Sequence, residues 1–143
     1  MSDPVCVSII LSDFVICEQG TRKNSLIGVF NNLNGIKFPW PSPLFFVTVA
    51  LTNLPPDTKN FNLTVRIEHP VTGHVLTSLG GEIKFGEPSN LSKELVFEVS
   101  FPVVPFLIPS AGHYEVTVLF NNSSIAKRLL TVNSITAPGT SPQ

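Results

Sequence analysis

The feature that most constrains the fold of this chain is how often proline and glycine interrupt it. Thirteen prolines and nine glycines are spread over 143 residues, and no window of ten or more residues repeats apolar side chains with a helical period. The remaining short segments are rich in valine, isoleucine, leucine, phenylalanine and threonine, which favour strands. Short strands separated by turn signals predict an all-β sandwich or barrel.

Three segments give the clearest strand patterns. Apolar and polar side chains alternate along Phe61–His69, and they alternate again along Leu91–Phe101. A period of two is expected of a strand that is buried on one face only. Leu44–Leu51 is apolar at nearly every position, which indicates a central strand that is covered on both faces.

The same reasoning gives the domain layout. Further strands are expected at Val5–Val15, Ser25–Leu33, His74–Leu79, Glu82–Phe85, Tyr114–Phe120 and Ile125–Val132. Hairpin turns are expected at Pro70–Gly73 and at Asn121–Ser124, whereas the prolines of Phe38–Pro43 argue against regular structure there. We therefore predict one immunoglobulin-like antiparallel β-sandwich, a Greek key of seven or eight strands over residues 1–133. A disordered tail is expected over residues 134–143, which are rich in Ser, Thr, Pro and Gly.

One motif supports the immunoglobulin-like prediction. The segment Ser110–Val116 resembles the entry to the sixth strand of immunoglobulin-like domains, where a tyrosine bonds back to the upstream backbone. Tyr114 would form this tyrosine corner. Val116 stands where antibody domains keep a disulfide cysteine, so no such bridge is expected.

The whole layout also resembles a small bacterial family of unassigned function. The resemblance rests on Leu26–Phe30, on the pair Phe38-Pro39 and on a closing Pro-Phe … Gly-x-Tyr pattern, and it covers roughly residues 5–133. It implies a bacterial, cytosolic β-sandwich and brings no catalytic residues with it. A fold shared with immunoglobulins does not indicate a function either, because one fold supports many unrelated functions.

Charge and hydropathy bear on several classes of partner. The net charge is −1 and the basic residues are scattered, so the clustered charge typical of nucleic-acid binding is missing. The longest apolar stretches, Leu44–Leu51 and Phe101–Pro109, fall short of the ~20 residues that span a bilayer. The N-terminus lacks the basic region of a signal peptide, so we expect a cytoplasmic protein with Cys6 and Cys17 as free thiols.

A search for chemistry finds no phosphate loop, no nucleophile elbow and no Cys/His metal spacing, so we predict no catalytic residues and no cofactor. The nearest approach to a metal site is the pair His69 and His74, which flanks the predicted turn. A third ligand would have to come from Glu68, Glu82 or His113. Because structural metal sites need four ligands, two exposed histidines beside a hairpin is the favoured reading.

Two proline-stiffened segments are the candidate partner surface. They carry Phe38, Trp40 and Phe106, and aromatic side chains on ordered backbone lose little entropy on binding. Alternatively, these rings close the ends of the sandwich. We predict a non-enzymatic binding or structural module that recognises a protein, or another copy of itself, through a sandwich-end loop or a strand edge. A small-ligand or carbohydrate-binding sandwich is the alternative, and an enzyme is the least supported class.

Overall fold

The computed structural model describes residues 3–21, 23–55, 58–84 and 96–135, and every regular element in these ranges is a strand. No helix in this part of the chain could cross a membrane. The eleven strands are β1 (Val5–Cys17), β2 (Asn24–Phe30), β3 (Asn32–Gly35), β4 (Trp40–Pro41), β5 (Phe45–Thr52), β6 (Asn60–Glu68), β7 (Val75–Lys84), β8 (Phe97–Val103), β9 (Leu107–Ile108), β10 (Gly112–Phe120) and β11 (Ser123–Ser134).

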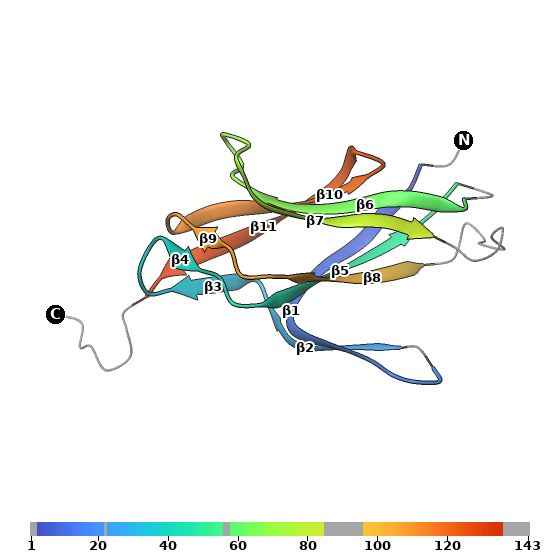
Figure 1. Ribbon diagram of the computed structural model, residues 1–143, viewed down its shortest axis with the longest axis horizontal. Coiled ribbons are helices and arrows are strands. Elements are labelled where there is room, and N and C mark those ends of the chain that lie inside the picture. Colours follow the sequence, from blue (N-terminus) through green and yellow to red (C-terminus); the bar gives the residue numbers. More distant parts are fainter. Residues whose placement is uncertain (1–2, 22, 56–57, 85–95, 136–143) are drawn as a thin grey trace.

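These strands form two stacked sheets and one short ladder (Figure 1). Sheet A has the order β2-β1-β5-β8, sheet B has the order β3-β11-β10-β6-β7, and β4 pairs with β9. The facing sets β1-β5-β8 and β11-β10-β6-β7 reproduce the two sheets of an immunoglobulin-like Greek key. The predicted fold class is confirmed.

The strand count is higher than predicted, and the pairing is not wholly antiparallel. The expected strand Ser25–Leu33 is divided in two, because the chain leaves sheet A after Phe30 and joins sheet B at Asn32. There β3 pairs with β11 in parallel. The expected edge strand Glu82–Phe85 is the end of β7 as far as Lys84, and residues 85–95 lie outside the described ranges.

The core follows the predicted alternation. Four alternate side chains of β6 are at most 2% exposed, namely Phe61, Leu63, Val65 and Ile67. The central strand β5 is buried at most positions on both faces, as expected. The ring of Phe61 in sheet B meets the ring of Phe97 in sheet A edge to face, with centroids 6.0 Å apart, so the sheets are joined by aromatic as well as aliphatic contacts.

Two local predictions from the sequence have clear counterparts in the structure. Asn121 and Asn122 have φ values of 46° and 68°, which is the backbone of a primed two-residue hairpin turn. The hydroxyl of Tyr114, a side chain only 2% exposed, donates a 2.6 Å hydrogen bond to the carbonyl of Ser110. This is the bond expected of a tyrosine corner.

Two other predictions need correction. The segment Phe38–Pro43 is not wholly irregular, because Trp40 and Pro41 pair with Ile108 and Leu107. A ladder of two residues tolerates proline, since only one of its amide donors is lost. The predicted tail begins too early: Ser134 belongs to β11, and the amide of Ile135 donates to the carbonyl of Gly35. Residues 136–143 lie outside the described ranges.

Candidate interaction site

The aromatic residues predicted as a partner surface lie at one end of the sandwich. Phe38, Trp40 and Phe106 are partly buried and pack against the core. The backbone holds this region together, since the amide of Ser42 donates to the carbonyl of Phe106 and the amide of Phe106 donates to the Ser42 hydroxyl. The structure therefore gives these rings a packing role, and contact with a partner stays a prediction.

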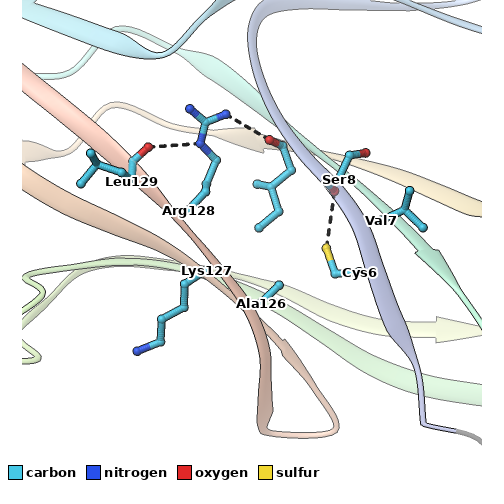
Figure 2. Close-up of a pocket in the computed structure, with 8 residues that line it drawn as sticks. Cys6, Val7, Ser8, Ala126, Lys127, Arg128 and Leu129 are labelled. Atoms are coloured by element: carbon cyan, nitrogen blue, oxygen red, sulfur yellow. Dashed lines mark hydrogen bonds between the residues drawn. The ribbon is translucent and has the colours of Figure 1, made fainter.

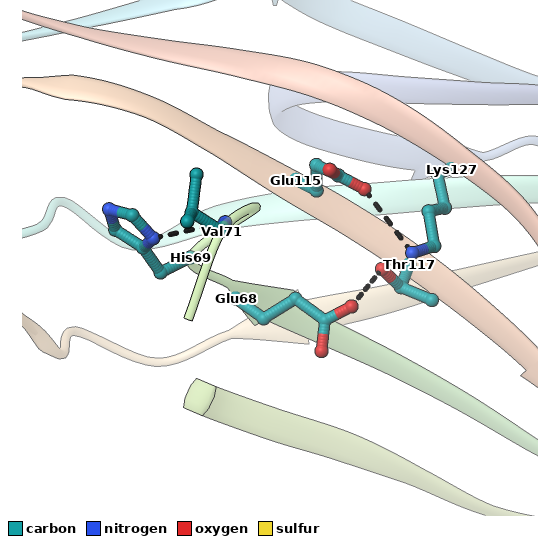
Figure 3. Close-up of polar contacts among 6 residues, drawn as sticks. All are labelled: Glu68, His69, Val71, Glu115, Thr117 and Lys127. Atoms are coloured by element: carbon teal, nitrogen blue, oxygen red, sulfur yellow. Dashed lines mark hydrogen bonds and ion pairs between the residues drawn. The ribbon is translucent and has the colours of Figure 1, made fainter. Parts of the chain in front are cut away.

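One of the two histidines beside the β6–β7 turn uses its ring in the local structure. Nδ1 of His69 accepts hydrogen bonds from the amides of Val71 and Thr72, each at 3.2 Å. Figure 3 shows the His69 ring turned toward the turn and away from Glu68. Because this nitrogen lone pair already accepts two bonds, it is not free to bind a metal.

The acidic residues near these histidines are also engaged. The hydroxyl of Thr117 donates to Glu68 at 2.6 Å, and Lys127 lies 3.5 Å from Glu115 (Figure 3). Within the described ranges, no three His, Cys, Asp or Glu side chains are placed to hold a metal ion.

A group of exposed apolar side chains lies on the β1–β2 hairpin. β1 pairs with β5 only as far as Ser12, and the strand then continues with β2 alone. This part of the hairpin extends away from the rest of sheet A, at the bottom of Figure 1. Alternate residues of paired strands share a face, and one face carries four large apolar side chains. They are Phe14 (60% exposed), Ile16 (53%), Ile27 (46%) and Val29 (57%), and we call them the hairpin face.

The hairpin face has no charge within it. Residues 14–17 and 24–30 contain no Lys, Arg, Asp or Glu. Among the described residues β2 is also the last strand of sheet A, and neither a proline nor an internal charged residue protects its outer edge. The side-chain Nδ2 of Asn24 donates to Oε1 of Glu98, which ties the hairpin to β8. The hairpin therefore presents an anchored, uncharged surface.

A second feature lies where the two sheets approach each other at β1 and β11. A groove of about 360 Å³ is lined there by Cys6–Ile9 of β1 and Ala126–Leu129 of β11, and we call it the seam (Figure 2). Burial raises the pKa of the Cys6 thiol, whose sulfur lies 3.5 Å from the carbonyl of Ser8. Cys17, the other free cysteine, is exposed on β1.

Arg128 bridges the seam. Its Nη1 donates to the carbonyl of Ile9 at 3.1 Å, its Nε donates to the carbonyl of Leu129 at 3.1 Å, and its Nη2 donates to Oδ1 of Asn31 at 2.8 Å. Partial burial lowers the pKa of this guanidinium, which nevertheless stays charged near neutral pH. One side chain thus joins β1, β11 and the β2–β3 junction.

Replacing Arg128 with alanine is expected to lower the free energy of unfolding by about 1–3 kcal/mol, because three charge-assisted hydrogen bonds are lost together. Arg128→Lys should recover only part of this loss, since an ammonium group cannot reproduce the planar fork. Urea unfolding of the two variants and the wild type measures the effect. An Arg128→Ala protein as stable as the wild type would contradict the bridging role.

The comparisons with known proteins identify a family. A model described as a family of unknown function, DUF6941, matches residues 7–133. No curated protein matches the chain.

Several solved structures are similar to the chain at low sequence identity. A Listeria innocua β-glucosidase has a TM-score of 0.48 at 10% identity, over 96% of this chain and 16% of that one. A Pseudomonas fluorescens alkylpurine DNA glycosylase has a TM-score of 0.44 at 10% identity, over 88% and 30%. An immunoglobulin-like protein of Pseudomonas aeruginosa has a TM-score of 0.44 at 14% identity, over 92% and 97%. The chain spans less than a third of the first two proteins.

Proposed function

The chain belongs to the DUF6941 family, to which no function is assigned, and from that starting point we propose that it is a non-enzymatic module that binds another protein through the hairpin face. The observation that carries the proposal is the grouping of Phe14, Ile16, Ile27 and Val29 on one exposed face. Monomeric proteins rarely expose contiguous apolar patches beyond a few hundred Å², and larger ones mark interaction sites.

The energetics of the hairpin face favour a protein partner. Burying the exposed half of a large apolar side chain contributes about 1 kcal/mol, so the four residues together offer roughly 4 kcal/mol toward binding. The open edge of β2 adds main-chain donors and acceptors that a strand of the partner can pair with. The apolar side chains would supply affinity for the partner, and main-chain pairing along the β2 edge would fix its orientation.

The proposal is tested by capturing the partner from the native host with wild-type protein and with a double variant, Phe14→Thr plus Ile27→Thr. Threonine keeps the β propensity of these positions and removes most of their apolar area. Both side chains are about half exposed, so the variant is expected to unfold at nearly the wild-type urea concentration. Its affinity for a captured partner should fall by about ten-fold to a hundred-fold.

A matched control carries the same kind of change elsewhere. Val71 and Leu107 are 86% and 62% exposed and lie away from the hairpin, so Val71→Thr plus Leu107→Thr should keep the partner. Analytical ultracentrifugation of the purified protein shows beforehand whether the partner is a second copy of the chain. A partner that binds the folded hairpin variant as tightly as the wild type would overturn the proposal.

A further inference from the structure

A second interaction surface follows from the open edge of β11. β3 pairs with β11 only over Thr131–Ser134, so the outer edge from Ser123 to Leu130 has no neighbouring strand among the described residues. The amide of Ile135 donates across this same edge to the carbonyl of Gly35. Main-chain groups alternate sides along a strand, so Leu129 and Lys127 also direct their amides and carbonyls toward this edge.

The structure fills only part of this edge. The carbonyl of Leu129 accepts a hydrogen bond from Nε of Arg128. This side-chain donor takes the place of the main-chain N–H that a neighbouring strand would supply. On this outer edge, the N–H of Leu129 and the N–H and C=O of Lys127 make no hydrogen bond to any described residue. These three groups lie on alternate residues of one edge, where the main chain of an added strand could hydrogen-bond to them.

Charge and apolar area indicate what such a strand would carry. The residues that line the seam include Lys127 and Arg128 and no acidic residue. Leu129, two residues from Lys127 on the same face of β11, is 54% exposed. Nζ of Lys127 lies 3.5 Å from Oε2 of Glu115, and the Lys127 side chain remains 53% exposed. Directly opposite residues of paired strands interact, so an acidic residue opposite Lys127 would share its ammonium with Glu115, and Leu129 favours an apolar residue.

We propose that the seam binds an extended segment of another protein as an additional strand on β11. An acidic residue of this segment lies opposite Lys127 and an apolar residue, two positions away, lies opposite Leu129. Arg128 keeps its bonds to Ile9 and Leu129 and adds to the positive potential under the segment. The seam is distinct from the hairpin face. The segment that binds the seam carries a carboxylate, whereas the partner of the hairpin face is recognised by apolar contacts and strand pairing.

The test uses two synthetic peptides that read the same in both directions, so that strand polarity does not matter. The acidic probe is acetyl-Thr-Val-Thr-Glu-Thr-Val-Thr-amide, and the basic probe has Lys in place of Glu. Each is titrated into ¹⁵N-labelled protein at low salt. The acidic probe is expected to shift the amides of residues 7–9 and 126–129, and to bind about ten-fold more tightly than the basic probe.

Two lysine variants test the origin of this preference. Lys127→Gln should reduce it to less than about three-fold, because the opposite charge is gone. Lys84→Gln is the matched control, since Lys84 also lies beside a glutamate, Glu82 at 3.4 Å, but on β7. It should keep the full preference.

Three results would overturn the proposal. The first is no shift of the seam amides with either probe at millimolar concentration. The second is equal binding of the acidic and basic probes to the wild-type protein. The third is a set of shifts confined to β2, β7 or β8, which would place strand addition on another edge. None of these outcomes depends on the hairpin face, so the two proposals succeed or fail separately.

Discussion

Replacing Gly80 with alanine is expected to destabilise the protein by at least about 3 kcal/mol, and the variant is expected to be largely unfolded at 37 °C. Gly80 has a φ of +140°, a region that side chains other than glycine rarely adopt. A Cβ at this position would lie 2.1 Å from the carbonyl oxygen of Leu63 and 2.8 Å from Cα of Thr64. Both atoms belong to the backbone of β6, which cannot move without breaking its pairing with β10.

The neighbouring glycine provides the control for this prediction. A Cβ at Gly81 would meet nothing within 4 Å. Gly81→Ala should therefore change the free energy of unfolding by no more than about 0.5 kcal/mol, and in the stabilising direction, because alanine restricts the unfolded chain. Urea unfolding of both variants measures the difference. If Gly80→Ala lay within about 1 kcal/mol of Gly81→Ala, the close approach of β7 to β6 would be wrong.

Replacing Trp40 with alanine is expected to cost about 2–4 kcal/mol of stability, somewhat below the loss for a fully buried tryptophan. The ring is partly buried against the core, and it lies over Gly35. A Cβ at Gly35 would fall 2.9 Å from the Trp40 ring and 2.8 Å from Cζ of Phe38, so this glycine leaves room for both rings. Removing the indole would open a cavity at the end of the sandwich.

The control for Trp40 lies on the strand paired with it. Leu107 is 62% exposed on β9, and Leu107→Ala should cost less than about 0.5 kcal/mol. Thermal melts of both variants, together with capture of the partner, separate two roles for the tryptophan. If Trp40→Ala kept the wild-type melting temperature and lost the partner, the ring would belong to the binding surface and the packing role would be wrong.

The sequence predicted the parts of the fold that depend on local patterns. The alternation in Phe61–His69 predicted which side chains enter the core, because a strand places successive residues on opposite faces. Asn121 and Asn122 predicted a primed turn, because asparagine tolerates positive φ. Tyr114 was assigned from a resemblance, and the hydrogen bond to Ser110 links residues only four apart. Each of these signals is contained in a few consecutive residues.

The two proposed surfaces could not be predicted in this way. Phe14, Ile16, Ile27 and Val29 alternate with other residues just as core side chains do. They lie on the part of the hairpin where β1 continues past its pairing with β5 after Ser12, and the alternation does not reveal how far two strands pair. The seam depends on contacts between residues 119 positions apart, Ile9 and Arg128. Such contacts are consequences of strand order rather than of local sequence.

Amide hydrogen exchange of the protein with and without its captured partner tests the central claim most directly. If the hairpin face is the binding surface, amides of residues 14–17 and 24–30 will exchange more slowly in the complex, while those of the β4–β9 ladder stay unchanged. Unchanged exchange throughout the hairpin, with protection confined to residues 38–42 and 106–108, would contradict the claim and assign the interaction to the end of the sandwich.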